Sequence, residues 1–392
     1  MQRYGQKFGQ KFRFPADADD EEKALRAQVR SFLQIQRDKG SFTPCADCWV
    51  SGANPAFSAM LGQQGWLGMT WPKQYGGQGR TALDRLVVTE ELLAAGAPVA
   101  AHWVADRQTG AQILRYGTEA QKQEILPPLA AGTSFAAIGM SEPQAGSDLA
   151  AVATRAEKDS NGNWIMNGRK IWSTGAHISD YMIVLARTSA ADGRNRQVGL
   201  SQFLVPLKTA GIEITGICDL AGSIHFNETL FDHVKLGQDA LLGTEGNGWA
   251  QCMGELATER SGPERFMTTF IVLERALETL NGKLDDQSIA IVGRLIAHLT
   301  TLRRMSRGIA RLIQQGDSPD TEAALVKQMG NVIEKDILND VRRLLAMVPR
   351  PQWPDSLAIL LDDATLRLPS NTLRGGTTEI LRGIIARQLG LR

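Results

Sequence analysis

Ser141–Asp148 has the sequence SEPQAGSD and Lys170–Thr174 has the sequence KIWST, and these two stretches decide how the chain is interpreted. The first is a loop of small residues, where backbone N–H groups can approach a ligand closely and serine hydroxyls can donate to it. The second predicts a strand on which Trp172 and Thr174 share a face. An aromatic plane beside a hydroxyl suits a flat ring ligand with a polar edge. Packing of Trp172 in a core is the alternative.

Around these stretches the apolar pattern has a period of two, with turn sequences such as Asn161-Gly162 and Asn167-Gly168 between the runs. Closely spaced short strands joined by tight turns favour a small antiparallel β-barrel or sandwich. The expected strands lie at 152–158, 164–171, 181–187, 199–206, 212–217 and 229–236.

The rest of the chain has helical periodicity. Before the strands, helices are expected at 17–37, 81–96 and 108–117, and after them at 289–313, 322–347 and 379–389. Arg303 and Arg307 lie between apolar positions of the 289–313 helix, and we expect them to face water. Long antiparallel helices of this kind form a bundle.

The predicted fold class is therefore α+β with three domains. An N-terminal helical domain covers 1–136, a central antiparallel β-barrel covers 137–246, and a C-terminal four-helix bundle covers 247–392. A chain of 392 residues is long enough for several cores.

Charge and composition exclude several functional classes. The formal net charge is +1, with 43 basic and 42 acidic residues, which argues against nucleic acid or an anionic membrane surface as the main partner. There is no apolar run of membrane-spanning length, and residues 1–24 are polar and charged, so a cytoplasmic location is expected. Cys45 and Cys48 form a single C-x-x-C pair without a second pair at ligand spacing, so no metal is indicated.

Five motifs, in order along nearly the whole chain, resemble those of acyl-CoA dehydrogenases. They are Gly65-Trp-Leu-Gly with Tyr75-Gly-Gly, Ser141–Asp148, Asn167–Thr174, Leu242–Trp249 and Ile384-Ile-Ala-Arg. The resemblance implies the acyl-CoA dehydrogenase fold, bound FAD, a tetramer and a flavoprotein oxidoreductase of fatty acid or steroid β-oxidation.

The same resemblance implies which residues contact the cofactor. The loop at 138–147 would meet the flavin and the thioester end of the substrate, with Ser141 near the polar edge of the ring and Ser147 near the CoA phosphates. Trp172 would pack on the isoalloxazine, and Thr174 would donate to N5, the atom that receives hydride. The residues expected to bind the cofactor are Ile138, Met140, Ser141, Gly146, Ser147, Trp172, Ser173, Thr174, Thr377 and Glu379.

The family reaction removes a proton from the α carbon and a hydride from the β carbon of an acyl thioester, so it needs a carboxylate base. Many members carry that base in a Tyr-Glu-Gly-Thr run, but Arg374–Thr377 has the sequence RGGT here, with Gly375 at the glutamate position. As in members similar to isovaleryl- and long-chain enzymes, Ala257–Arg260 (ATER) carries a glutamate before an arginine. Glu259 is therefore the expected base, and Arg260 a helper or a packing partner of the final segment.

Two other carboxylates, Glu255 and Glu264, lie about one turn from Glu259 and are the fallback candidates. Gly375 can still supply a backbone N–H to the thioester carbonyl, and it leaves room for a bulky or branched acyl chain. The expected substrate contacts are Ser147, Arg260 and Gly375, and residues 103–108 would line the acyl pocket by analogy, with helix packing and surface charge as the alternative.

Two segments that complete the neighbouring subunit's FAD site in typical homotetramers lack their usual residues. Leu280–Ser288 has no Arg-x-x-Phe-Gly, and Met347–Asp355 has no Gln-x-x-Gly-Gly. The chain therefore resembles the base-bearing subunit of α2β2 heterotetramers that act on steroid side chains and other bulky acyl-CoAs, with a homo-oligomer as the alternative. Electron-transfer flavoprotein is the expected acceptor. A non-catalytic scaffold subunit, an oxidase and a thioester desulfinase are the competing functions.

Overall fold

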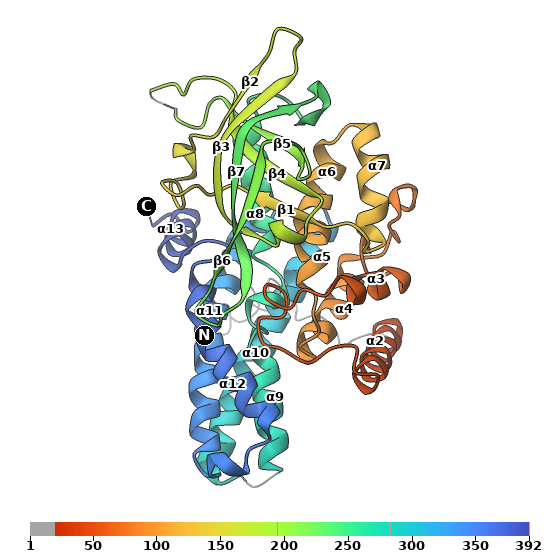
Figure 1. Ribbon diagram of the computed structural model, residues 1–392. Helices are drawn as coiled ribbons and strands as arrows, with labels where there is room; N and C mark the ends of the chain where they lie inside the picture. Colours follow the sequence, from red (N-terminus) through yellow and green to blue (C-terminus); the bar gives the residue numbers. More distant parts are fainter. Residues whose placement is uncertain (1–19, 194, 282–283, 392) are drawn as a thin grey trace, which may run out of the picture.

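The computed structural model describes residues 20–193, 195–281 and 284–391, except for the side chains of 255–259. Helices come first, a sheet follows, and helices return after it (Figure 1). The N-terminal helices lie along one side of the sheet, and the long C-terminal helices extend below it as a bundle (Figure 1). Within these ranges, no helix has both the length and the apolar character needed to cross a membrane.

Side-chain caps set where two of the N-terminal helices begin. Thr81 and Asp84 form a capping box at the start of α4, and Thr118 and Gln121 form another at the start of α7, directly after the previous helix ends at Gly117. The elements are α2 (Asp20–Asp38), α3 (Pro55–Gln63), α4 (Ala82–Ala94), α5 (Ala100–Val104), the π-helix η2 (Ala105–Thr109), α6 (Gly110–Tyr116) and α7 (Glu119–Ala130).

Within the described residues the sheet has eight strands, in the order β6-β7-β3-β2-β4-β5-β8, with β1 paired to β4. They are β1 (Ala136–Gly139), β2 (Arg155–Lys158), β3 (Trp164–Thr174), β4 (Tyr181–Arg187), β5 (Leu200–Pro206), β6 (Ile212–Cys218), β7 (Ile224–Leu236) and β8 (Leu241–Leu242). Each of the six expected strands is present, and β4 has the bounds that the sequence predicted.

The predicted order of helical domain, central sheet and helical bundle is confirmed, and the sheet itself is mixed and not closed. β1 and β2 both run parallel to β4, and β6 and β8 end the ladder without pairing to each other in the part of the chain that is described. The sequence does not reveal β1, because its four residues show no alternation of polar and apolar side chains. Its parallel pairing needs a long crossover, which residues 140–180 provide.

The C-terminal helices enclose one apolar core. Leu295, Leu302 and Ile309 of α10 are buried in it together with Ile337 and Val341 of α11. The elements are α8 (Gly248–Glu259), α9 (Phe270–Leu280), α10 (Asp286–Gln314), α11 (Asp320–Leu345), α12 (Asp355–Arg367) and α13 (Thr378–Gln388). Short 3-10 turns are η1 (Lys73–Tyr75), η3 (Leu149–Ala151), η4 (Ala176–Ile178), η5 (Gln238–Ala240), η6 (Pro263–Arg265), η7 (Arg350–Gln352) and η8 (Leu368–Thr372).

The arginine face of α10 contacts the N-terminal helices. Arg303 is exposed as expected, whereas the expectation that Arg307 faces water was wrong. Arg307 is buried, and its two terminal nitrogens donate to the two carboxylate oxygens of Glu22 at 2.7 Å each. Arg303 donates from Nε to Glu90 over 2.9 Å. The carboxylates come from α2 and α4, far away in sequence, so periodicity within α10 could not identify them.

Candidate functional site

A buried ion pair holds the SEPQAGSD loop against β3. Lys170 is 0% exposed, and its Nζ donates to Glu142 Oε1 over 2.8 Å and to the carbonyl of Met140 over 3.0 Å. The carboxylate of Glu142 also accepts the backbone N–H groups of Ala153 and Thr154, at 2.7 and 2.9 Å. The loop and the strand that follows it are therefore fixed relative to each other. Sequence reasoning did not identify this pair, although both residues stand inside the quoted motifs.

The charges of the pair stabilise each other. Burial opposes ionisation of Glu142, but Lys170 and the hydrogen-bond donors outweigh it and hold the pKa of Glu142 below its ordinary value. Burial lowers the pKa of Lys170 to about 8, with Glu142 acting in the opposite direction. Both groups are charged at neutral pH, and the loss of either partner would leave a buried charge uncompensated.

Trp172 stands on a bulge of β3 and faces outward. The pairing of β3 with β7 shifts register between Lys170 and Ser173, and Trp172 has a φ of 62°. Its side chain is 55% exposed and meets the edge of the Phe226 ring, with 5.8 Å between ring centroids. The alternative that Trp172 is packed in a core is excluded. A bulky residue in the left-handed region costs about 1–2 kcal/mol, and such strain concentrates at functional sites.

The surroundings of Trp172 combine a polar edge with open space. Ser173 is buried while Thr174 is half-buried, so Trp172 and Thr174 lie on the same, less buried side of the strand. A Cβ on Gly139 would come within 2.8 Å of Met182 Sδ, whereas one on Gly146 would meet nothing within 4 Å. The loop is thus tightly packed at β1 and free of neighbours at its tip, which suits a flat ring ligand.

The remaining expected residues of the loop differ in accessibility. Ile138, Met140 and Ser141 are half-buried, and Ser147 is exposed. The backbone N–H of Ile171 donates to the carbonyl of Ser141 over 2.9 Å, which ties the start of the motif to β3. The two quoted stretches therefore lie next to each other.

The end of α8 meets the loop that precedes α13. Arg260 is buried, and its Nε donates to the carbonyl of Gly375 over 2.8 Å. Glu259 is the last residue of α8 and adjoins Arg260 along the backbone, but its side chain, like that of Glu255, lies outside the described part of the structure. The Arg260 side chain thus ties residue 375 to the end of α8, where residue 259 lies.

Glycine at position 375 has a structural reason of its own. Gly375 and Gly376 have φ values of 66° and 103°, where glycine avoids the strain of other residues. A Cβ on Gly375 would also lie 3.3 Å from the guanidinium of Arg265.

The Oγ of Thr377 caps α13 by accepting the N–H of Ile380 over 3.4 Å, and Glu379 is exposed in the first turn. Hydrogen bonds from its own backbone N–H and from Thr377 lower the pKa of Glu379.

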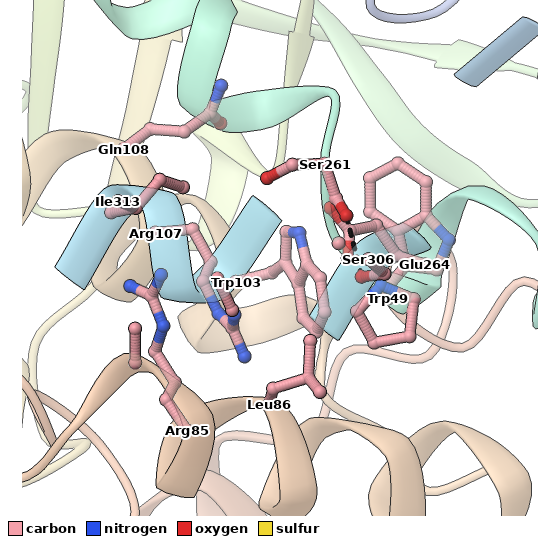
Figure 2. A pocket seen from close by; sticks show the side chains of 14 residues that line it. Trp49, Arg85, Leu86, Trp103, Arg107, Gln108, Ser261, Glu264, Ser306 and Ile313 are labelled. Carbon is pink, nitrogen blue, oxygen red and sulfur yellow. Dashed lines mark hydrogen bonds between the residues drawn. The ribbon is translucent and has the colours of Figure 1, made fainter. Parts of the chain in front are cut away.

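A cavity opens beside the segment that follows α8 (Figure 2). Three residues that the sequence assigned to an acyl pocket, Trp103, Arg107 and Gln108, line it. Sequence reasoning missed most of the wall, because it comes from four further segments that no local motif connects. These lining residues are Trp49, Ala82, Arg85, Leu86, Ser261, Gly262, Pro263, Glu264, Ser306, Ala310 and Ile313.

Glu264, one of the fallback bases, stands in the cavity wall. It is buried, and its Oε1 lies 3.8 Å from Nε of Arg265. Its Oε2 has no hydrogen-bond partner among the described residues. The cavity wall therefore offers a carboxylate that a substrate could meet.

The two segments that lack the usual nucleotide-binding residues lie together at one end of the bundle. Ser288 donates from Oγ to the sulfur of Met347 over 3.4 Å. Arg350 is used within the chain: it lies over the Trp353 ring at 5.5 Å and pairs with Asp362 at 2.5 Å.

Comparisons with known proteins agree with this architecture. Residues 19–133 match the family described as acyl-CoA dehydrogenase, N-terminal domain, and residues 137–234 match acyl-CoA dehydrogenase, middle domain. Acyl-CoA dehydrogenase IpdE1 of Mycobacterium tuberculosis is 34% identical over 94% of this chain and 97% of its own length.

Two solved structures extend the comparison. The Tcur3481-Tcur3483 steroid ACAD superposes with a TM-score of 0.82 at 25% identity, over 95% of this chain and 98% of that one. The ChsE4-ChsE5 complex from Mycobacterium tuberculosis superposes with a TM-score of 0.81 at 28% identity, over 96% of this chain and 99% of that one. Together with the match to IpdE1 over nearly the whole of both chains, these findings show that the protein belongs to the acyl-CoA dehydrogenase family of flavoprotein oxidoreductases.

Proposed function

We propose that this chain is the base-bearing subunit of an FAD-dependent acyl-CoA dehydrogenase, with Glu259 as the base and a bulky, branched or steroid-type acyl-CoA as substrate. The hydrogen bond from Arg260 to Gly375 is the observation that carries the proposal. It joins the residue after Glu259 to the segment where many family members carry their base. A glutamate at residue 259 and a glutamate at residue 375 would thus be attached to the backbone in the same region of the protein.

The residues of the cradle fit a flavin. Trp172 offers an exposed ring held in a strained conformation, and the tip of the loop at Gly146 has open space around it. Thr174 adds a hydroxyl on the side of the strand where Trp172 lies, and Ser141 adds another at the start of the loop. FAD, when bound, supplies the acceptor for the hydride that leaves the β carbon.

The chain itself would provide binding and proton transfer. Glu259 would take the α proton, and the backbone N–H of Gly375 would donate to the thioester carbonyl, which makes the α proton more acidic. Arg260 keeps Gly375 in place by holding its carbonyl, so the N–H on the same loop is positioned as well. Ser147, exposed at the tip of the loop, would contact the CoA moiety.

The heteromeric assembly is part of the proposal. Two of the similar solved proteins are complexes of two different chains by name, Tcur3481-Tcur3483 and ChsE4-ChsE5, and the first is a steroid ACAD. In this chain Arg350 is paired with Asp362 and lies over the Trp353 ring, so its contacts are within its own chain. A partner subunit would supply the contacts to the diphosphate, and electron-transfer flavoprotein would take the electrons.

Co-expression with a second acyl-CoA dehydrogenase-like subunit from the same organism tests the proposal. The purified complex should contain FAD, and a steroid-type or branched acyl-CoA should bleach the flavin absorbance without oxygen, with no rapid recovery when air is admitted. The chain expressed alone should hold FAD weakly. Rapid recovery in air would indicate an oxidase, and no bleaching by any member of a broad acyl-CoA panel would indicate a non-catalytic subunit.

A further inference from the structure

One arginine of the cavity has no partner among the residues that the structure describes. The guanidinium of Arg85 makes no hydrogen bond or ion pair with any residue in the described ranges, although the side chain is half-buried. Burial, followed by the nearby charge of Arg107, lowers the pKa of Arg85 to about 10, so it remains protonated at neutral pH. A half-buried charge without a partner is unfavourable, and side chains of this kind are normally paired.

Arg107, in contrast, is well satisfied. Its guanidinium lies 4.8 Å above the Trp103 ring, donates to the hydroxyl of Thr89 and comes within 3.2 Å of the Asp106 carboxylate. Asp106 in turn accepts the backbone N–H of Gly68 over 2.7 Å. Asp106 is therefore already engaged and does not pair with Arg85.

The cavity has charges of opposite sign at its two ends. Figure 2 shows Arg85 and Arg107 beside each other at one end, where the charge of Arg107 acts on Arg85, and Glu264 beyond Trp103 at the other. Two adjacent guanidinium groups repel each other, and an anion between them would remove that repulsion. A neutral oxygen could accept a hydrogen bond but could not offset the charge.

The backbone at the arginine end is also unusual. Arg107 and Gln108 lie on the π-helix η2, within a run that is otherwise helical from Ala100 to Tyr116. Single π turns are rare and are frequent at functional sites, because they change the direction of the side chains they carry. This feature points to a ligand role for the same end of the cavity.

We propose that Arg85, assisted by Arg107, binds a carboxylate carried by the acyl group of the substrate at a point remote from the thioester. This inference rests on the proposed function, since it names the class of acyl-CoA that the site would take. The planar guanidinium can donate two parallel hydrogen bonds to one carboxylate, which gives both affinity and orientation.

The test compares thioesters that differ only in charge at the far end of the acyl group. Mono-CoA thioesters of dicarboxylic acids of several lengths, and their methyl esters, are measured with the co-expressed complex for equilibrium binding by calorimetry and for anaerobic flavin reduction. The proteins are wild type, Arg85→Gln, Arg85→Lys and Arg80→Gln, in which an exposed arginine is removed as a charge-matched control.

Wild type should bind at least one acid about 10- to 100-fold more tightly than its ester, as expected for a hydrogen-bonded charge. Arg85→Gln should abolish that preference, Arg85→Lys should retain part of it, and Arg80→Gln should leave it unchanged. Because Arg85 has no partner in the described structure, Arg85→Gln should melt at the wild-type temperature or above. A lower melting temperature would show that Arg85 supports the fold instead.

Equal binding of acid and ester by wild type, or equal preferences in Arg85→Gln and Arg80→Gln, would overturn the inference. A preference for a ketone or alcohol over the acid would overturn it too. If the complex reduces its flavin without such a preference, the proposed function holds and the inference fails. If no thioester reduces the flavin but the acid still binds through Arg85, the proposed function fails and the carboxylate site holds.

Discussion

Nε of Arg260 and the carbonyl oxygen of Gly375 are joined by a hydrogen bond of 2.8 Å. This bond connects the end of α8 to the loop before α13, across more than a hundred residues of sequence. Since Glu259 directly precedes Arg260, a base at residue 259 would stand in the same region as the glutamate that many family members carry near residue 375. Gly375 is then free to adopt the left-handed conformation that the loop requires.

Glu259→Gln should reduce the rate of anaerobic flavin reduction by about 10²- to 10⁴-fold, since this is the usual contribution of a general base. Stopped-flow absorbance of the co-expressed complex gives that rate. Glu264→Gln is the matched control, because Glu264 is the described carboxylate of the neighbouring cavity. If Glu264→Gln has the larger effect, Glu264 is the base and the assignment of Glu259 is wrong.

Trp172→Gly should weaken retention of FAD by roughly two- to tenfold, the value of one aromatic stacking contact, measured as the dissociation constant of FAD in the complex. The unfolding free energy should change by less than about 1 kcal/mol, because glycine relieves the strained φ while only an edge contact with Phe226 is lost. Trp164→Ala on the same strand should cost about 3–5 kcal/mol, since Trp164 is buried in the sheet core. Unchanged FAD affinity in Trp172→Gly would contradict the stacking role.

Lys170→Met should destabilise the protein by about 3–5 kcal/mol, because it leaves the Glu142 carboxylate buried without its partner. Denaturant unfolding monitored by tryptophan fluorescence measures the change. Lys208→Met provides the comparison: Lys208 is 88% exposed and pairs with Asp180 at 3.4 Å, so its loss should cost less than about 1 kcal/mol. Equal losses in the two variants would show that burial of the ion pair has no energetic consequence.

Stability should fall between about pH 5 and pH 7 because of Glu334. Burial raises the pKa of Glu334 to about 7, against hydrogen bonds from Thr269 and Thr268, whereas the ordinary value is 4.5. The folded state therefore binds the proton more tightly than the unfolded state. Protonated Glu334 therefore adds to the free energy of unfolding. This contribution, at most about 3 kcal/mol, is complete below pH 4.5 and is lost as the pH rises through 7.

Urea unfolding from pH 5 to pH 8 checks this dependence, and Glu334→Gln should remove it. Glu322→Gln, an exposed substitution on the same helix α11, should retain the wild-type slope. If the free energy of unfolding depends on pH in the same way in Glu334→Gln and Glu322→Gln, the pH dependence belongs to other groups.

The sequence by itself determined the local features of this protein. Alternation of apolar residues placed the strands, so that β4 was predicted at its observed bounds. The motifs around Ser141 and Trp172 identified the family. These predictions succeeded because periodicity and motifs are carried by residues close together in the chain.

Only the tertiary structure decided what depends on residues far apart in sequence. The parallel pairing of β1 with β4, the bulge that turns Trp172 outward and the docking of Arg307 on Glu22 follow from contacts between distant segments. The cavity is assembled in the same way, and the isolation of Arg85 within it could not be read from the sequence around residue 85. A charged side chain is unpaired only relative to its neighbours in space, and those neighbours are set by the packing of the whole fold.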